Sequence, residues 1–313
     1  MNTGILSIFD YPKEMQEKTL DIKTVCECNR CLHCKTLHPQ VSLINLENQP
    51  LIQEEIRFEF YAILLIEECK DGCTCCGRRY YDYSNATMVF LMPGEIFRMN
   101  EDNTLPDKGY LLVFHPDLLF RTTLDNHIGN YNFFRYAKEE ALHLSQRETE
   151  KVTCCLWNIE EELHHAIDAH SATILSRHIE LLLDYCTRYY ERQFITREAK
   201  NKNILVSMDK LMDEYIASER LYDGLMPSAV QCAKKLGLSV SYFCDLLKFE
   251  TGRTFDEYFQ MKRMDAAKGL LHDPDNTPVI VARKLGYPNV QYFSLIFKRI
   301  TGLAPNEYRR MPN

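Results

Sequence analysis

The chain has 313 residues, 45% of them hydrophobic, so it is long and apolar enough for two domains with ordinary cores. Its net charge of −7 excludes a protein that is basic over its whole surface, and its longest apolar run, 60–66, is far shorter than a membrane span. The first residues lack the basic start and apolar core of a signal peptide, so we expect a cytoplasmic protein without a membrane partner.

Residues 1–40 form a lead-in segment that contains a group of cysteines, namely Cys26, Cys28, Cys31 and Cys34, with His33 and His38 close by. These side chains have two interpretations: small hydrophobic residues, or a zinc or redox site, because thiolates bind soft metals. The spacing C-x-C-x-x-C-x-x-C lacks the usual long loop between two ligand pairs. We therefore assign no metal and no cofactor here and keep metal or thiol sensing as an alternative. A second group, Cys69, Cys73, Cys75 and Cys76, surrounds two glycines and predicts a turn, with the same kind of metal site as its alternative.

Residues 41–128 predict short strands at 41–46, 56–67, 79–82, 87–92 and 110–115, rich in β-branched and aromatic residues. Turn dipeptides follow at Pro93-Gly94 and Pro106-Asp107. Many short strands joined by turns favour an antiparallel barrel or jelly roll, which we place at 41–145.

The interior of such a barrel can hold one small ligand. Seven polar or aromatic residues are candidates for lining it, each of which could equally be a partly buried structural residue: Arg57, Glu59, Tyr61, Tyr80, Tyr81, Tyr83 and His115. The stretch contains no H-x-H pair, so we expect no catalytic metal, and we assign no catalytic residue and no enzyme activity.

Residues 146–196 predict helices with a regular apolar stripe. Its members recur at spacings of four, three, four and three: Leu175, Ile179, Leu182, Cys186 and Tyr189. The stripe is either a dimer seam or the face of a helix packed on its own barrel. The charged and polar residues that follow predict a linker at 197–203.

The last hundred residues contain an internal repeat. The first copy holds Ala233, Lys235, Leu236, Gly237, Tyr242-Phe243, Thr251-Gly252 and Tyr258. The second holds Ala282, Lys284, Leu285, Gly286, Tyr292-Phe293, Thr301-Gly302 and Tyr308. Only the step from Gly to Tyr-Phe differs, being five residues in the first copy and six in the second. This agreement is a strong signal of two equivalent structural units.

Each copy predicts a helix, a tight turn and a second helix, at 227–252 and 278–302 of an all-α domain spanning 204–313. Pro227 and Pro278 suit a first helical turn, with Thr277 as an N-cap. Gly237 and Gly286 suit a left-handed helix end. Such helix-turn-helix units lay their second helix in the DNA major groove.

The segment between the copies, 254–272, predicts one helix that begins with a capping box at Thr254 and Glu257. Nineteen helical residues rise by about 28 Å. Successive major grooves on one side of DNA lie about 34 Å apart, so a single rigid helix can hold two reading helices in adjacent grooves.

These residues resemble the AraC/XylS family of bacterial transcription regulators. The similarity rests on the runs at 263–271 and 282–287, on 292–298, and on Thr301-Gly302 and Pro305. The resemblance implies an α+β chain: a cupin-like antiparallel sensing barrel, a helical dimerisation segment at 146–196, and a DNA-binding domain. It implies double-stranded promoter DNA as partner, a homodimer, a small-molecule effector, and RNA polymerase if the chain is an activator.

The resemblance also implies which residues contact DNA, listed here for both copies: Ser239, Ser241, Tyr242, Cys244, Asp245, Lys248, Arg253, Asn289, Gln291, Tyr292, Ser294, Leu295, Lys298 and Arg299. Gln291 can pair with adenine and Leu295 can touch a thymine methyl. Asp245 and Leu295 depart from the family pattern, in which many members carry Arg. Asp245 could accept from a cytosine amino group, but it repels phosphate. Within the two copies, Phe243, Leu246, Leu247, Phe293, Ile296 and Phe297 are expected to face inward.

Charge is distributed unevenly between the two parts of the chain. Residues 204–313 carry 15 Lys and Arg against 13 Asp and Glu, whereas the preceding residues carry 22 against 31. DNA contact by the C-terminal part alone is therefore favoured. We expect a ligand-responsive transcription regulator; the alternatives are a metal or thiol sensor with the same output, or a DNA-alkylation-repair regulator using the Cys26–Cys34 group.

Overall fold

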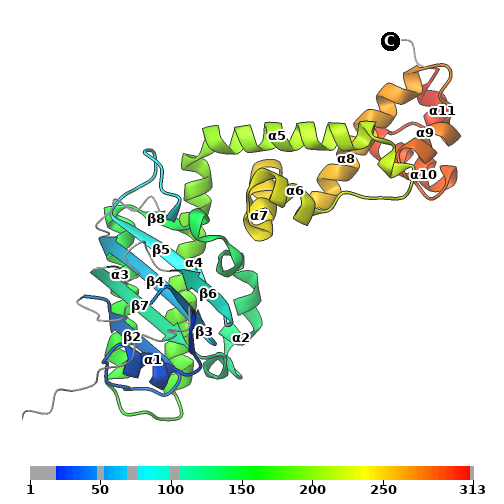
Figure 1. The fold of residues 1–313 in the computed structure, drawn as a ribbon. Coiled ribbons are helices and arrows are strands. Elements are labelled where there is room, and N and C mark those ends of the chain that lie inside the picture. Colours follow the sequence, from blue (N-terminus) through cyan, green and yellow to red (C-terminus); the bar gives the residue numbers. More distant parts are fainter. Residues whose placement is uncertain (1–18, 48–52, 69–75, 99–105, 107, 311–313) are drawn as a thin grey trace, which may run out of the picture.

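The computed structural model describes residues 19–47, 53–68, 76–98, 106 and 108–310. Figure 1 shows a sheet-containing N-terminal region, two long helices beside it, and a helical C-terminal region at the far end of a connecting helix. The chain therefore has a mixed α+β architecture. None of the helices among the described residues is both long and apolar enough to cross a membrane.

A five-stranded antiparallel sheet forms the centre of the N-terminal region. Its order is β2 (Val41–Asn45), β7 (Lys108–Phe114), β4 (Tyr61–Glu68), β5 (Ala86–Leu91) and β8 (Leu142–Leu144). In the register, Ile63 of β4 faces Leu112 of β7 on one side and Phe90 of β5 on the other. The alternation of β4 separates two cores, because Ile63 and Leu65 join one apolar cluster while Ala62 and Leu64 join the other.

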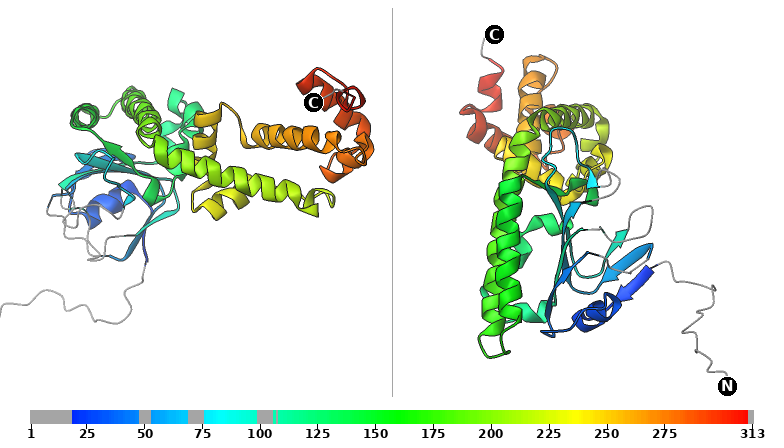
Figure 2. Two further views of the ribbon diagram at one scale, coloured as in Figure 1. Left: turned by 90° about the horizontal axis from the view of Figure 1, so that it is seen from above. Right: turned by 90° about the vertical axis from the view of Figure 1, so that its left-hand side faces the viewer.

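Each face of this sheet has its own cover. One face packs against α3 (Gln146–Leu163) and α4 (Ser171–Thr196). The other packs against α1 (Val25–Cys31) and a three-stranded sheet of β1 (Thr19–Ile22), β3 (Glu55–Phe58) and β6 (Glu95–Arg98). The right-hand view of Figure 2 shows these layers edge on.

The strands differ in part from those expected. The single strand predicted at 56–67 is divided between β3 and β4, and the strand predicted at 79–82 is wrong, because these residues form a turn. Strands β1 and β3 pair in parallel, and the hydrogen-bonded pairs of the described strands form two sheets. A closed antiparallel barrel is therefore not shown by the described residues.

Short helical turns connect β7 to β8 and lie beside the sheet. They are η2 (Pro116–Leu119), α2 (Thr123–His127), η3 (Ile128–Asn130), η4 (Asn132–Arg135) and η5 (Lys138–Glu140). Their aromatic residues Phe133 and Phe134 pack against Phe90 of β5. Together with Phe194 of α4, this segment, 128–140, meets the first helix-turn-helix unit.

The apolar stripe of α4 lies inside the protomer. Leu175, Ile179, Leu182, Cys186 and Tyr189 are all buried in the cluster that joins α4 to α3 and the sheet. The interpretation of this stripe as an exposed dimer seam is therefore wrong, and a helix packed on its own sheet domain is correct. A homodimer stays a prediction, with a different surface as its interface.

The expected linker at 197–203 is largely helical. Arg197 ends α4 and at the same time precedes α5 (Glu198–Ala217), which runs from the sheet region to the C-terminal helices (Figure 1). Met208 and Met212 of α5 are fully buried in the core of the first helix-turn-helix unit, so α5 is part of the C-terminal domain as well as its connection.

The C-terminal region consists of α5 and seven short elements. They are η6 (Glu219–Leu221), α6 (Ala229–Leu236), α7 (Val240–Thr251), α8 (Phe255–His272), α9 (Pro278–Lys284), α10 (Val290–Thr301) and α11 (Pro305–Tyr308). Helix α8 is shared between two small cores: its Phe255 and Phe259 pack with the first copy, and its Met264 and Leu271 pack with the second. This arrangement confirms the division into two helical units.

Candidate DNA-binding surface

Local capping signals place both reading helices, α7 and α10, as the sequence predicts. The side chains of Ser239 and Asn289 accept hydrogen bonds from the backbone N–H groups of Tyr242 and Tyr292 and so begin the two helices. Gly237, at φ +67°, ends α6 in the left-handed region that glycine adopts without steric cost. Thr277 caps α9 with Pro278 in its first turn, whereas α6 begins one residue after Ser228, so Pro227 lies outside it.

The second reading helix presents a polar and cationic surface. Phe293 and Phe297 are fully buried beneath it, and Ile296 is partly buried, as expected. Asn289, Gln291, Tyr292, Leu295, Lys298 and Arg299 are exposed, and Ser294 is partly buried. The helix contains no carboxylate, so it can approach a phosphate backbone without charge repulsion.

The first reading helix is buried on two sides. Phe243 and Leu247 face the core of their own unit, as predicted. Tyr242 and Leu246 instead lie in the apolar cluster of the N-terminal region, so Leu246 is buried as predicted but against a different partner. Helix α7 therefore contacts both regions of the chain (Figure 1).

Hydrogen bonds fix this contact at two places, the N-cap residue of α7 and Asp245 near the middle of the helix. Glu140 accepts from the backbone N–H of Ser239 at 2.8 Å and from the Ser239 hydroxyl. Asp245 accepts from Asn132 Nδ2 at 2.9 Å and from the Tyr136 hydroxyl at 2.7 Å. Burial raises the pKa of Glu140, and the two bonds from Ser239 oppose that rise.

A buried ion pair lies at the junction of the two regions. Arg197 donates from Nε and Nη2 to the two carboxylate oxygens of Asp82 at 2.8 and 2.7 Å, and their side chains are 0% and 1% exposed. Burial acts to raise the pKa of Asp82, but the hydrogen bonds and charge of Arg197 outweigh it and hold that pKa below its usual range. This two-point pair ties the start of α5 to the loop before β5.

The remaining predicted DNA contacts of the first copy differ in exposure. Ser241 and Cys244 are partly buried, and Lys248 and Arg253 are exposed. Lys248 and Asp245 line a cavity of about 310 Å³ between the regions, together with Tyr190, Phe194 and Phe249. All fourteen residues predicted to contact DNA stay predictions, because no nucleic acid is present in the structure.

The candidate ligand residues of the predicted barrel are not brought together. Arg57 of β3 forms an ion pair with Asp21 at 3.1 Å, and Glu59 is exposed beyond that strand. Tyr61 stacks on Phe114 in the other sheet, Tyr80 and Tyr81 contact each other in a turn, and Tyr83 lies under Arg192. His115 begins η2 by accepting from the N–H of Asp117. Their role in binding an effector stays a prediction without a common site.

The cysteine alternatives fall on partly described segments. Cys26, Cys28 and Cys31 belong to α1, where Cys26 is exposed and Cys28 is fully buried. Burial raises the pKa of Cys28 and Cys31 and so disfavours the thiolate. Among the described residues, no three or more His, Cys, Asp or Glu side chains are grouped to hold a metal ion. Cys69, Cys73 and Cys75 lie outside the described residues.

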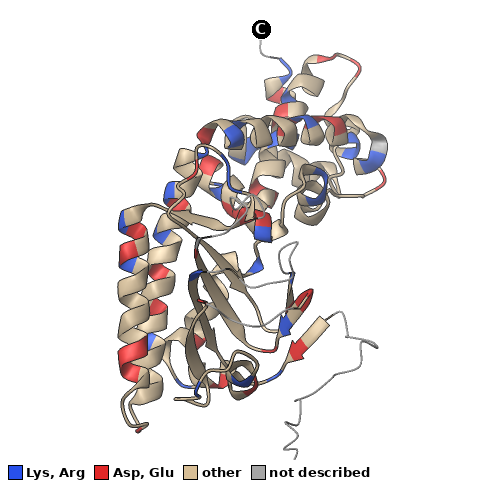
Figure 3. Ribbon diagram, turned by 60° about the vertical axis from the view of Figure 1, so that its left-hand side comes forward, with Lys and Arg blue, Asp and Glu red and all other residues tan. Residues whose placement is uncertain are grey.

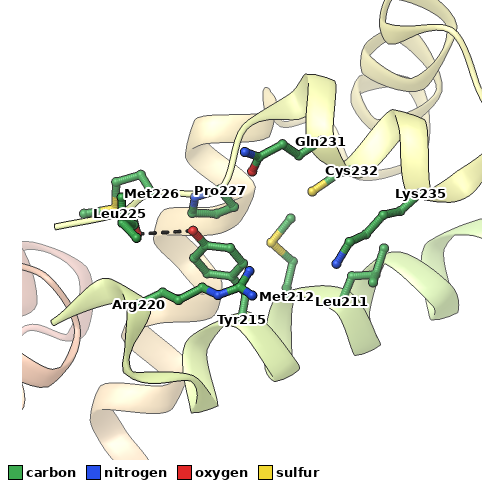
Figure 4. A pocket seen from close by; sticks show the side chains of 10 residues that line it. All are labelled: Leu211, Met212, Tyr215, Arg220, Leu225, Met226, Pro227, Gln231, Cys232 and Lys235. Carbon is green, nitrogen blue, oxygen red and sulfur yellow. Dashed lines mark hydrogen bonds between the residues drawn. The ribbon is translucent and has the colours of Figure 1, made fainter. Parts of the chain in front are cut away.

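A second cavity, of about 390 Å³, lies within the C-terminal domain between α5, α6 and the segment that joins them (Figure 4). Met212, Tyr215 and Cys232 form its wall, and Tyr215 donates to the carbonyl oxygen of Leu225 at 3.4 Å. None of the residues that line it is a predicted DNA contact.

Sequence reasoning missed the partners of the first reading helix. Asn132, Tyr136 and Glu140 belong to the irregular segment after β7, 99 to 113 residues before the side chains they bind. The one sequence signal that pointed here was the presence of Asp245 at a position where a cation was expected. Lys and Arg are interspersed with Asp and Glu along the helices of both regions (Figure 3), so charge alone did not mark the contact.

Two capped helix-turn-helix units joined by one helix define the class of a DNA-binding domain, and comparisons with known proteins give the family. A family described as "Helix-turn-helix domain" matches residues 232–311. The uncharacterized HTH-type transcriptional regulator YtdP of Bacillus subtilis (strain 168) is 30% identical over 113 residues, which cover 36% of this chain and 14% of that protein. This chain therefore spans about a seventh of that relative's length.

Solved structures show the same regional likeness. The C-terminal domain of the two-component response regulator yesN from Fusobacterium nucleatum is 30% identical and covers 32% of this chain and 96% of its own, with a TM-score of 0.27. An AraC-type transcriptional regulator from Chromobacterium violaceum is 21% identical and covers 37% of this chain and 99% of its own, with a TM-score of 0.33. The C-terminal region of this chain belongs to the AraC-type helix-turn-helix family.

Proposed function

We propose that this chain is a transcription regulator that binds double-stranded promoter DNA through its C-terminal domain and responds to a small molecule through its N-terminal region. The observation that carries the proposal is the exposed surface of α10. Its Gln291, Lys298 and Arg299 project from a capped helix that contains no carboxylate. A helix of this kind reads base edges with its amide and holds phosphates with its cations.

The N-terminal region supports the sensing half of the proposal through its architecture. It has two apolar cores of its own and contacts the DNA-binding domain at α7 and α5. An effector that alters the segment 128–140 or the Asp82–Arg197 pair would change the surroundings of a reading helix directly. A homodimer and, for an activator, contact with RNA polymerase are further parts of this proposal.

The proposal is tested by selecting binding sites for the full chain from a pool of random duplexes. We expect one recurring sequence to be enriched. Gln291→Ala should then lose about 1–3 kcal/mol of discrimination at a single base position, which is the scale of one bidentate contact. Lys298→Ala should weaken binding to every sequence and make it less dependent on salt.

The matched control is Gln146→Ala, which removes the same side chain from α3 of the N-terminal region. It should leave both the selected sequence and the affinity unchanged. Enrichment of no sequence by the unmodified chain, or an equal effect of the two Gln→Ala variants, would contradict the assignment of α10 as a reading helix.

A further inference from the structure

The repeat provides an internal comparison for the burial of α7. Tyr242 is 0% exposed, whereas its counterpart Tyr292 is 49% exposed. Asp245 is partly buried and doubly hydrogen-bonded, whereas its counterpart Leu295 is 67% exposed. The two units share their helices and caps, so the additional burial of the first copy comes from the N-terminal region and not from the helix-turn-helix fold.

The group that covers the start of α7 has the chemistry of a DNA phosphate. Glu140 places a carboxylate on the N–H and hydroxyl of Ser239, the residue that caps α7. The beginning of a helix is where unpaired N–H groups and the helix dipole attract an anion, and reading helices use it to hold backbone phosphates. In this structure, the carboxylate of Glu140 has the position that a phosphate needs.

The group that meets Asp245 has the chemistry of a base edge. Asn132 donates from its NH₂ group, as the N4 amino group of cytosine does in the major groove. Tyr136 adds a hydroxyl donor to the second oxygen of the same carboxylate. Asp245 is therefore accounted for by a partner within the chain, although it is unfavourable on a helix that faces phosphates.

We propose that the N-terminal region masks the first reading helix with a surface that imitates DNA, made of Asn132, Tyr136 and Glu140. The inference rests on the proposed function and extends it to regulation. In the masked state only α10 is open to DNA, because it lies at the far end of α8 from the N-terminal region (Figures 1 and 2). Release of α7 from this surface lets the chain bind with both reading helices.

The experiment replaces one neutral donor to Asp245 with a negatively charged acceptor in the full chain. Asn132→Asp places a carboxylate opposite that of Asp245, at a contact of 2.9 Å, and should release α7. The double variant Asn132→Asp with Asp245→Asn exchanges donor and acceptor, so the amide at 245 donates to position 132 and still accepts from Tyr136. It should restore the masked state.

Two readouts follow each variant: affinity for a labelled random-sequence duplex at one fixed salt concentration, and hydrogen exchange of the amides of 239–249. Asn132→Asp should raise the affinity about tenfold, on the scale of one lost hydrogen bond to a charged group, and should speed the exchange. In the double variant both quantities should return to near those of the unmodified chain. Asn126→Asp adds the same charge on the exposed surface of α2, outside the cavity that Asp245 lines, and should change neither.

Unchanged affinity and exchange in Asn132→Asp would overturn the proposal. So would a double variant that keeps both the raised affinity and the faster exchange, because the exchanged donor and acceptor would then have failed to restore the contact. If no variant binds any duplex, the proposed function itself fails. The exchange rates then still decide whether Asn132 holds Asp245.

Discussion

Gly237 and Gly286 have nearly the same backbone angles, φ +67° and +69°, but different surroundings. A Cβ atom at Gly237 would meet nothing within 4 Å, whereas one at Gly286 would lie 2.5 Å from the carbonyl oxygen of Leu221. The second glycine therefore serves both the turn and the close packing of the second unit against η6.

We expect Gly286→Ala to destabilise the chain more than Gly237→Ala. The first change combines left-handed strain with a clash against backbone, and the second introduces only the strain, of about 1–2 kcal/mol. Denaturant unfolding followed by circular dichroism measures both. Equal losses of stability would show that the Leu221 contact yields without cost.

His143 is a fully buried titratable group of β8. Its side chain shares a hydrogen bond of 3.0 Å with Thr87, and it is 0% exposed. Burial lowers its pKa to about 4, while Asp82 opposes the shift and Arg197 adds to it. The imidazole is therefore neutral in the folded chain at neutral pH.

The free energy of unfolding should fall as the pH is lowered from 6.5 to about 4. Between pH 6.5 and about 4 the unfolded histidine binds a proton that the folded one does not, so acid favours unfolding. The loss should reach about 3 kcal/mol at most, and His143→Gln should remove it. Urea titrations of the unmodified chain and of His143→Gln at pH 7.5 and pH 5 measure the difference. The same pH dependence in both would mean that folding does not lower the pKa of His143.

Among the elements, α4 shows most directly what an apolar stripe does and does not reveal. The stripe at 175–189 marks the buried face of a helix, but a spacing of three and four residues is the same whether the partner is another chain or the helix's own sheet. Leu182 is 0% exposed, and its neighbour Leu181 is 44% exposed.

Leu182→Ala should lower the free energy of unfolding by about 2–5 kcal/mol, because it leaves a cavity in the core. Leu181→Ala, one residue away on the open face, should change it by no more than about 0.5 kcal/mol. Thermal or urea unfolding distinguishes them. A Leu182→Ala chain that keeps its stability but changes its sedimentation would return the stripe to the role of a dimer seam.

The helix-turn-helix units were predictable because their signals are local. Ser239, Asn289, Thr254 and Gly252 lie within a few residues of the helix ends that they fix, and the repeat doubled each signal. The sheets were less predictable, since the strand pairs join residues up to 73 positions apart, as Val41 of β2 and Phe114 of β7. The turn at 79–82 has the aromatic composition of a strand, yet Asp82 is held by Arg197, 115 residues away.

In the candidate DNA-binding surface, too, local features were predictable and contacts between distant residues were not. Gln291 and Lys298 were expected on an outward face from helical spacing and the family resemblance together, and the structure exposes them. The cover of α7 depends on Asn132, Tyr136 and Glu140, which have no regular spacing to Asp245 or Ser239. The sequence showed that Asp245 is unusual on a helix expected to face DNA, but it gave no indication of the residues that bind this carboxylate.

At the scale of the whole molecule, the two C-terminal cores meet the N-terminal cores chiefly at α7, and Ile204 and Leu238 also pack, partly buried, against the N-terminal cluster. Tyr242 and Leu246 belong to the N-terminal cluster, while every other buried apolar residue of the C-terminal helices belongs to one of the two C-terminal cores among the described residues. Removing the N-terminal region should therefore leave both helix-turn-helix units folded, with the apolar side chains that packed against it newly exposed, among them Tyr242 and Leu246.

A fragment of residues 198–313, which keeps α5 and its buried Met208 and Met212, should be mostly helical by circular dichroism. It should bind random-sequence duplexes about tenfold more tightly than the full chain, because the carboxylate and amide that cover α7 are gone. Anisotropy titrations at one salt concentration make the comparison. A helical fragment that binds no better than the full chain would mean that α7 is equally accessible in both.

A small change in the orientation of helix α5 at Arg197 becomes a larger displacement at its far end. Its 20 residues extend about 30 Å from the junction at Arg197, so a tilt of about 10° at that junction moves its far end by about 5 Å. Base pairs are stacked about 3.4 Å apart, so this tilt carries the distant reading helix past more than one of them. If the proposed function holds, the ion pair between Asp82 and Arg197 therefore fixes the direction in which α5 presents α10 to DNA.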